Sequence, residues 1–309
     1  MTLDRYKPKK PTVYFTNGCV IHKGFVAVSC GSLADPEAAT SVITFYDGKR
    51  WGGQKVQDDR IVSFAYSAET NTLYALGKFG AVISVQAAGE FSFDTARGRL
   101  VRQDLPGASE GNLSSIAASG KIVFACGWSG KLYELRNQNW QACSTGLPGQ
   151  DDHDFLDLCC VDGREVYAVG MKGVIYYFDG HHWHNLDSPT NQHLQAITSV
   201  RQDEIYIAGK KGGIYKGNKD GWQFIGDPSV TVDFWGAREF GGKLFLSGDT
   251  DALYQHDGAS ISKVDMGIEY LVNTHKLDSR DGVLWSFGID DLVKYDGKSW
   301  EYVVCSMNQ

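Results

Sequence analysis

Proline, long apolar runs and clustered positive charge are all scarce in this sequence of 309 residues. It has 7 prolines against 36 glycines, a balance that favours many tight turns over extended linkers. No window approaches the roughly 18 consecutive apolar residues that suggest a membrane-spanning helix. The first segment, MTLDRYKPKKPTVYF, also lacks the apolar stretch of a secretion signal. We therefore expect a soluble, cytoplasmic protein with no membrane partner.

Positive charge is outnumbered by negative charge. Lys and Arg total 30, Asp and Glu total 37, and the net charge is −7. Nucleic-acid-binding proteins concentrate basic residues on one surface, whereas the short run Lys7–Lys10 lies in what we expect to be a solvated tail. The seven cysteines are odd in number and irregularly spaced, which favours free thiols over a disulfide framework. The sequence predicts no nucleic-acid partner and no cofactor.

What the sequence has in abundance is repetition. An apolar stretch that ends in glycine recurs seven times, with anchoring glycines at Gly31, Gly77, Gly127, Gly170, Gly209, Gly248 and Gly288. Each copy contains short runs of Val, Ile, Tyr, Phe and Leu separated by Gly or Asp-Gly turns, the pattern of consecutive β-hairpins. Units of about 40 residues with four short strands each predict an all-β, seven-bladed β-propeller with four antiparallel strands per blade.

The repeats predict a tail and one domain. We expect residues 1–10 to be the tail and residues 11–309 a single propeller, with approximate blades at 11–57, 58–106, 112–146, 154–187, 193–227, 230–265 and 268–305. Innermost strands should carry small residues where blades crowd together, and we align Ala117–Ala118, Cys159–Cys160, Thr198–Ser199 and Gly236–Ala237 there. Segment 86–112 is longer than the corresponding segments of the other copies. We expect it to extend the outer hairpin of blade two, as a lateral contact point or a tolerated insertion.

Three copies contain a shared aromatic-Asp-Gly-x-x-Trp motif: YDGKRW at 46–51, FDGHHW at 178–183 and YDGKSW at 295–300. With the strands before it, this motif resembles the repeats of a broad class of bacterial β-propellers. It is also similar to a relaxed Asp-box, the Ser-x-Asp-x-Gly-x-x-Trp turn of sialidase-like propellers, with an aromatic residue in place of the leading Ser or Thr. The resemblance implies the fold and no particular activity, because propellers host many unrelated functions.

Three histidines, His181, His182 and His184, follow one of these Asp-Gly pairs. Alternation along a strand places His182 and His184 on one face. Two imidazoles can bind a metal, but a closed zinc site needs about four ligands, and no other copy has His at a matching position. We interpret the three histidines as a decorated hairpin turn and predict no metal there.

The candidate functional surface is the propeller face that carries the turns between second and third strands and the loops between blades. These turns are basic with aromatic and Met side chains in copies two to five, and acidic in copies six and seven. Because interface centres favour aromatic residues and Met, we expect this face to bind a protein. The predicted contact residues are Phe79, Trp128, Met171, Lys172, Lys210, Lys211, Asp249, Asp251, Asp290 and Asp291, with Asp152 and His153 from an inter-blade loop.

Catalytic signatures are missing: the sequence has no nucleophile elbow, P-loop, HExxH motif or Rossmann fingerprint. The framework repeats while the turns differ from blade to blade, which favours one asymmetric protein partner over seven equivalent ligands. Our leading hypothesis is a non-enzymatic inhibitor or immunity protein, monomeric by itself, that covers the active site of a bacterial toxin or enzyme. One alternative is a small-ligand- or carbohydrate-binding propeller, or a hydrolase or lyase, acting at the channel mouth. Another is a scaffold subunit of a larger complex.

Overall fold

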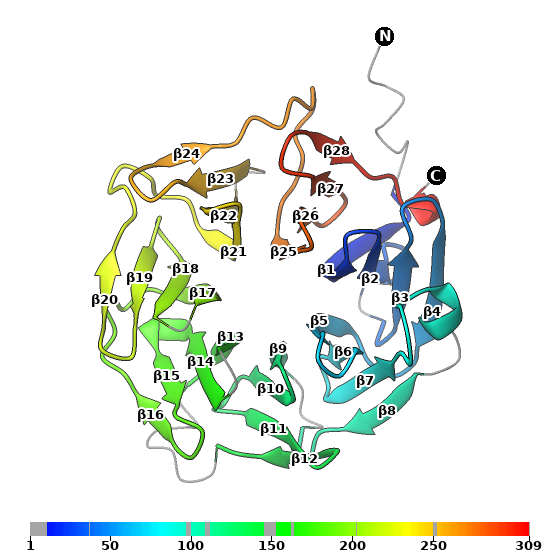
Figure 1. Cartoon of the computed structure of the whole chain (residues 1–309), viewed down its shortest axis with the longest axis horizontal. Helices are drawn as coiled ribbons and strands as arrows, with labels where there is room; N and C mark the ends of the chain where they lie inside the picture. The colour runs from blue at the N-terminus through cyan, green and yellow to red at the C-terminus, as the bar shows by residue number, and fades with distance from the viewer. Residues whose placement is uncertain are drawn as a thin grey trace.

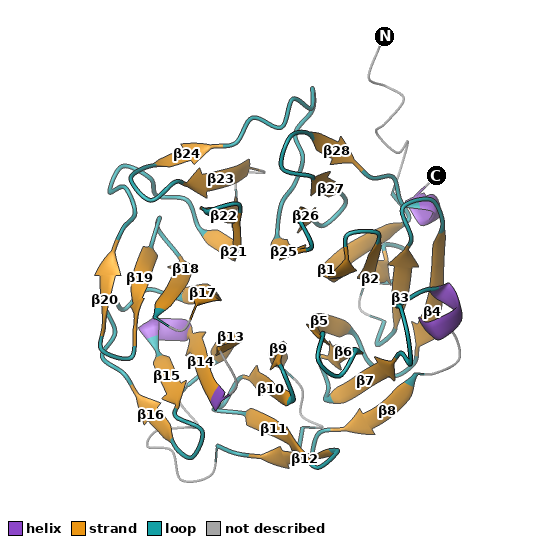
Figure 2. Ribbon diagram, in the orientation of Figure 1, coloured by secondary structure: helices purple, strands orange, loops and turns teal. Residues whose placement is uncertain are grey.

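Seven four-stranded antiparallel sheets stand radially around a central axis (Figure 1). The computed structural model describes residues 11–36, 38–96, 100–108, 112–144, 153–161, 164–201, 203–249 and 252–308. Each sheet consists of four strands that are consecutive in the sequence, the first innermost and the fourth outermost (Figure 2). The prediction of an all-β, seven-bladed propeller with four antiparallel strands per blade is confirmed.

The strands are numbered in chain order, four to a blade. Blades one to three contain β1 (Val13–His22), β2 (Phe25–Ser32), β3 (Ser41–Tyr46), β4 (Trp51–Val56), β5 (Ile61–Ser67), β6 (Thr72–Gly77), β7 (Ala81–Gln86), β8 (Val101–Asp104), β9 (Leu113–Ser119), β10 (Ile122–Gly127), β11 (Leu132–Arg136) and β12 (Asn139–Ala142). Blades four and five contain β13 (Phe155–Val161), β14 (Glu165–Gly170), β15 (Ile175–Phe178), β16 (Trp183–Asn185), β17 (Leu194–Arg201), β18 (Glu204–Gly209), β19 (Ile214–Asn218) and β20 (Gly221–Phe224). Blades six and seven contain β21 (Phe234–Phe240), β22 (Lys243–Gly248), β23 (Ala252–His256), β24 (Ile261–Lys263), β25 (Lys276–Arg280), β26 (Val283–Phe287), β27 (Leu292–Tyr295) and β28 (Trp300–Tyr302).

The anchoring glycine at the end of each second strand is explained by a close approach of chain segments. A Cβ added to Gly170 would lie 2.0 Å from the backbone oxygen of Asp154, and one added to Gly209 would lie 2.2 Å from that of His193. The same two oxygens accept hydrogen bonds from the residues after the glycines, Met171 (2.9 Å) and Lys210 (3.0 Å). The repeated glycine therefore allows the inter-blade loop to hydrogen-bond the end of the second strand.

Strand pairing defines which inner-strand residues are equivalent. In every blade, one residue of the first strand pairs with the second-strand residue that lies three positions before the anchoring glycine. In chain order, these first-strand residues are Gly18, Ala65, Ala117, Cys159, Thr198, Arg238 and Asp278. The prediction that Gly236–Ala237 occupies this level in blade six is wrong, because Gly236 pairs with Ser247, immediately before the glycine. Arg238 is the true equivalent, and its guanidinium forms an ion pair with Asp278 of blade seven. At this first-strand position, an ion pair joins blades six and seven, whereas the other blades have smaller uncharged side chains.

The tandem cysteines Cys159 and Cys160 are packing residues. Cys159 belongs to the core between blades four and five, and Cys160 packs against the core between blades three and four. Desolvation raises the pKa of the Cys160 thiol to about 12, and the pKa of Cys159 is also raised well above its usual value by burial. All seven cysteines of the chain are unpaired, as the sequence predicts.

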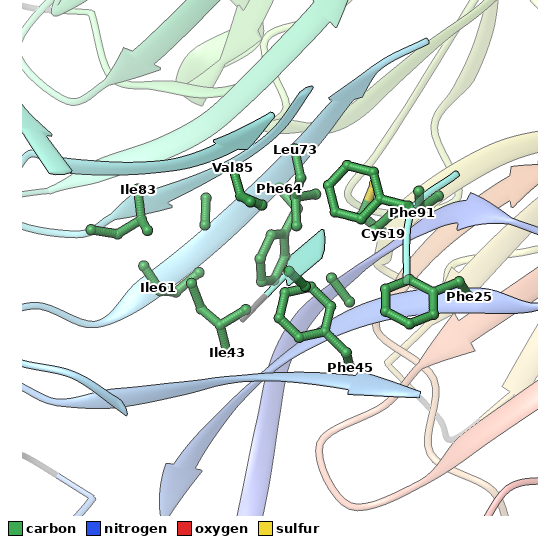
Figure 3. Close-up of a cluster of buried hydrophobic side chains, with 14 of the residues drawn as sticks. Cys19, Phe25, Ile43, Phe45, Ile61, Phe64, Leu73, Ile83, Val85 and Phe91 are labelled. Atoms are coloured by element: carbon green, nitrogen blue, oxygen red, sulfur yellow. The ribbon is translucent and has the colours of Figure 1, made fainter. Parts of the chain in front are cut away.

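The segment between β7 and β8 extends the outer hairpin of blade two and includes the short helix α1 (Phe93–Ala96), which lies beside β4 of blade one (Figure 2). Phe91 is buried and stands 6.2 Å from Phe25 between ring centroids, within the core shared by blades one and two (Figure 3). The Arg50 guanidinium of blade one lies 5.0 Å above the Phe93 ring. This insertion therefore fills the space between two blades, and its aromatic side chains are used in packing.

The ring closes between blades seven and one without an exchanged strand, since each of these blades has four strands of its own. Asp278 of β25 accepts a hydrogen bond from the Val20 backbone N–H (2.7 Å), and the Arg280 Nε donates to the Val20 oxygen (3.1 Å). A mixed core that includes Val26, Val28, Trp285 and Phe287 fills the seam. Closure depends on side-chain packing and a few polar bridges.

We expect Gly18→Ala to lower the free energy of unfolding by about 2–3 kcal/mol, because overpacking at a tight core contact costs that much. The added Cβ would lie 2.1 Å from the Phe287 ring across the closing seam. Gly24→Ala is the control, since its Cβ meets nothing nearer than 3.7 Å. Equilibrium unfolding in urea measures both. Equal stability of the two variants would contradict the prediction, and partial recovery in Gly18→Ala/Phe287→Leu would locate the clash.

Candidate functional site: the loop face

We call the propeller end with the second-to-third-strand turns and the inter-blade loops the loop face. Both kinds of connection lie at the same end because the strands within each blade are antiparallel. Backbone hydrogen bonds tie them together, as between Lys78 and Arg60 (2.7 Å) and between Trp128 and Asn112 (3.0 Å). The described connections of the loop face are thus tied to one another by backbone hydrogen bonds.

Side chains just before the innermost strands hold four of the turns. Each of them accepts a hydrogen bond from a backbone N–H in a second-to-third-strand turn. The bonds are Ser129 N to Asp154 Oδ1 (2.9 Å), Lys172 N to His193 Nδ1 (3.0 Å), Lys211 N to Asp233 Oδ1 (2.9 Å) and Asp290 N to Asn273 Oδ1 (3.2 Å). Ser129, Lys172 and Lys211 also have left-handed φ values of 54°, 57° and 54°. A non-glycine residue is held in this region only when its surroundings stabilise it, so these turns are firmly shaped.

Asp59 holds the turn of blade two from within. Its carboxylate is 1% exposed and accepts hydrogen bonds from the N–H groups of Phe79 (2.9 Å), Ala81 (2.9 Å) and Arg60 (2.7 Å). Three backbone donors around one buried carboxylate satisfy its charge. The backbone that carries the exposed Phe79 ring is consequently held in place.

The structure places most of the predicted contact residues on the surface of the loop face. Phe79 is 37% exposed and Trp128 is 40% exposed. Lys172, Lys211 and Asp249 are exposed, whereas Met171, Lys210, Asp290 and His153 are half-buried. Lys210 Nζ lies 3.5 Å from Asp233 Oδ2 and so forms an ion pair with the carboxylate that also accepts the Lys211 N–H of the same turn. Asp152 and Asp251 lie outside the described residues.

Asp291 and His153 are tied into the fold. The expectation that Asp291 presents a surface charge is wrong: it is 9% exposed and accepts hydrogen bonds from the Asn273 N–H (2.9 Å) and the Tyr302 hydroxyl (3.0 Å). Asp291 is buried because the inter-blade loop containing Asn273 packs against it and donates a backbone N–H to its carboxylate. The imidazole of His153 packs against the rings of Tyr176 (5.5 Å) and Phe155 (6.5 Å).

Sequence reasoning missed three exposed apolar residues. Among the described residues, eight large apolar side chains are strongly exposed, and five of them lie in connections of the loop face. These are Leu33, Phe79, Trp128, Leu271 and Ile289. Leu271 is 73% exposed and Ile289 is 54% exposed, both more than the predicted Phe79 and Trp128. The sequence feature that could have identified them is an apolar residue within a turn, as at Ile289, which precedes Asp290 and Asp291.

The histidine cluster lies at the opposite end of the propeller, in the turn between the outer strands β15 and β16. Asp179 Oδ1 accepts the backbone N–H groups of His181 and His182 (both 2.7 Å), and Asp179 Oδ2 lies 2.8 Å from His184 Nε2. These contacts, the His182 N–H first, lower the pKa of Asp179. The turns at Asp47, Asp257 and Asp296 use the same carboxylate-to-backbone bonds. The three histidines belong to a structural hairpin turn, as predicted.

The central channel encloses a cavity of about 180 Å³ whose charged lining residues are Asp157, Arg238, Lys276, Asp278 and Arg280. Asp157 accepts hydrogen bonds from Ser115 Oγ (2.7 Å) and from the Ile197 N–H (3.0 Å), on the inner strands to either side of its own. Lys276 Nζ donates to the Trp235 oxygen (3.1 Å). The channel charges thus connect neighbouring inner strands, whose inward edges pair with no strand among the residues that the structure describes.

Comparison with known proteins relates the chain to one curated protein. No protein-family model matches it. It is 30% identical over 311 residues to the immune protein Tsi7 of Pseudomonas aeruginosa, an alignment that covers 94% of this chain and 98% of that protein. The chain belongs to the Tsi7 family. Because the alignment spans both proteins almost completely, the family relationship extends to all seven blades.

The solved structures similar to this Tsi7-family member share its fold at low identity. The structure of YCF48 bound to D1 peptide superposes with a TM-score of 0.70 and 14% identity, covering 96% of this chain and 95% of that one. The WD40 propeller domain of Doa1 superposes with a TM-score of 0.69 and 12% identity, covering 97% and 96%. These likenesses confirm the propeller. Among the described residues, no helix has the length and hydropathy needed to cross a membrane.

We expect Asp59→Ala to lower the free energy of unfolding of this Tsi7-family protein by about 3 kcal/mol. The substitution leaves three backbone N–H groups without their acceptor, and each buried unsatisfied donor costs about 1–3 kcal/mol. The neighbouring Asp58→Asn is the control, because Asp58 is exposed. Urea unfolding followed by tryptophan fluorescence measures the difference. If both variants unfold at the same urea concentration, the carboxylate does not hold the turn.

A second expectation concerns pH and His275, which precedes β25 and packs against Trp235 (6.0 Å). Burial, aided by Lys276, lowers the pKa of His275 from 6.5 to about 3. Below pH 6.5 the imidazole of His275 therefore becomes protonated in the unfolded chain but stays neutral in the folded chain. Protonation stabilises the unfolded chain, so the free energy of unfolding decreases as the pH falls. From pH 7 to pH 5 we expect a loss of about 2 kcal/mol. Urea unfolding across this range should show a flatter profile for His275→Gln; parallel profiles would contradict the assignment.

Proposed function

We propose that this protein is a cytosolic immunity protein that binds one toxin protein through its loop face and blocks the toxin's active site. The observation that carries the proposal is the 30% identity to the immune protein Tsi7 over 94% of the chain. Its repeats agree in framework and differ in the turns of the loop face. A surface of this kind suits one asymmetric protein partner.

The shape of the loop face supports binding at low ordering cost. Its turns are held by Asp154, His193, Asp233 and Asn273 before any partner arrives. Association loses less entropy when loops are already ordered, so more of the contact energy appears as affinity. The exposed Phe79 and Trp128 rings are of the residue type that dominates interface energetics.

Blocking an active site requires no catalytic group on the inhibitor. The covering surface needs only to exclude substrate and to dissociate slowly. At about 1 μM free inhibitor, a Kd of about 1 nM leaves roughly one toxin molecule in a thousand unbound, which corresponds to about 12 kcal/mol of binding free energy. Interfaces of standard size reach this value when a few large residues are well buried.

The proposal is tested in the native host with a tagged chain. Wild type is compared with Phe79→Ser/Trp128→Ser on the loop face and with Val101→Ser/Val200→Ser, a matched pair of exposed apolar residues outside that face (57% and 41% exposed). We expect wild type and the control to retain one protein at 1:1 stoichiometry, and the loop-face variant to lose it by at least about tenfold in affinity. Deleting the gene should harm only cells that make the recovered protein.

Two results would overturn the proposal. One is the absence of any stoichiometric partner together with normal growth of the deletion strain. The other is a small molecule bound in the channel of natively purified protein, detected by mass spectrometry, with no partner protein recovered. That second result would favour a ligand-binding propeller acting at the channel mouth.

A further inference from the structure

One sector of the loop face differs from the rest in charge. It consists of the inter-blade loop 264–275, the turn 288–291 of blade seven and the described residues 32–36 and 38–40 of the blade-one turn, and we call it the acidic sector. No Lys or Arg occurs in these three segments. Asp35, Asp265 and Glu269 are exposed in them and Asp290 is half-buried. By contrast, the corresponding turns of blades two to five contain Lys78, Lys131, Lys172, Lys210 and Lys211.

The three segments are joined to one another through the start of the chain's first strand. Phe15 N donates to the Ile289 oxygen (2.7 Å), Leu33 N donates to the Thr12 oxygen (3.0 Å), and the Tyr14 hydroxyl donates to the Pro36 oxygen (3.2 Å). Asn273 connects the inter-blade loop to Asp290. In Figure 1, β1 of blade one lies next to β25 and β26 of blade seven. The acidic sector is therefore one surface, located over the closing seam of the ring.

Exposed apolar side chains lie within the same sector. Leu271, Ile289 and Leu33 are 73%, 54% and 40% exposed. Leu271 remains exposed although its neighbour Tyr270 packs against Tyr302, with ring centroids 5.5 Å apart. The loop is thus anchored from beneath while its most apolar side chain faces outward. The segments that carry these side chains are linked by hydrogen bonds, and a large exposed apolar patch on a protein surface commonly marks a site that another surface covers.

We propose that the acidic sector is the principal docking site for the toxin and that it accepts a partner surface in which Lys or Arg residues surround apolar side chains. This inference rests on the proposed function. Leu271, Ile289 and Leu33 provide the apolar centre of the contact. The carboxylates of Asp35, Asp265, Glu269 and Asp290 provide the surrounding negative charge, which accelerates association with a cationic partner and disfavours acidic ones.

The chemistry of the partner is tested first with defined probes and the full chain. The probes are a labelled 15-residue peptide of Leu and Lys, ordered so that the leucines share one helix face, and its counterpart with Glu in place of Lys. Fluorescence anisotropy should show the Leu–Lys peptide binding at least about tenfold more tightly than the Leu–Glu peptide. Leu271→Ser/Ile289→Ser should weaken that binding at least about tenfold.

A charge-matched pair of variants separates this site from the general attraction of an acidic protein for a cationic peptide. Asp35→Lys/Glu269→Lys changes two exposed carboxylates of the acidic sector, and Asp203→Lys/Asp220→Lys changes two exposed carboxylates at the opposite end. Only the first pair should weaken the Leu–Lys peptide at least about tenfold. Equal weakening by both pairs, or equal binding of both peptides by wild type, would overturn the proposal.

A chain that begins at Pro11 tests another occupant of the sector. The first ten residues include Arg5, Lys7, Lys9 and Lys10. If the shortened chain binds the Leu–Lys peptide much more tightly than the full chain, the tail and not a partner fills the sector, and the proposal fails. Equal affinity of the two chains supports a separate partner.

The protein recovered in the native-host experiment provides the last comparison. Loss of that protein by Asp35→Lys/Glu269→Lys, with retention by Asp203→Lys/Asp220→Lys, would support the acidic sector as its docking site. If the acidic-sector variant keeps the protein while Phe79→Ser/Trp128→Ser loses it, the acidic sector is overturned and the proposed immunity function stands.

Discussion

The contact between each inter-blade loop and the glycine at the end of a second strand is the feature on which the other parts of this propeller depend. At Gly170 a side chain would occupy the space of the Asp154 backbone oxygen, 2.0 Å from an added Cβ. Without the side chain, that oxygen accepts the Met171 N–H, and blade four is joined to the loop that leads into it. Four of the loops that make such contacts also supply the acceptors that shape the turns of the loop face. Ring assembly and site geometry therefore have a common origin.

A second constraint comes from the inner edge of each blade. In the described part of the chain, the first strand of every sheet pairs with no strand on its channel side, so its backbone groups need other partners. Asp157 and Asp278 supply them by accepting N–H groups from neighbouring inner strands. Asp157 and Asp278 of the channel thus have a structural role in joining neighbouring blades.

The loop face combines a rigid framework with turns that differ between blades. An inhibitor benefits from both properties, because rigid turns lose little entropy on binding and different turns can match one asymmetric surface. The chain belongs to the Tsi7 family, and Tsi7 itself is an immune protein. The face is divided into a lysine-bearing region and an acidic, apolar region, so the proposed partner would bind in one orientation.

The fold could be read from the sequence because its signals are local and repeated: a glycine every 39 to 50 residues, and Asp-Gly turns whose carboxylates bond the backbone two and three residues later. The same reading located Phe79 and Trp128 on the loop face, since turn residues are seldom buried. It failed for Asp291, which is buried by an inter-blade loop distant in sequence, and for Arg238, whose level depends on strand register. It also overlooked Leu271, because exposure is a property of the assembled surface. The sequence by itself determined the number of blades, their strands and their turns; only the tertiary structure decided which charges face the solvent, because that depends on which chain segments pack against each turn.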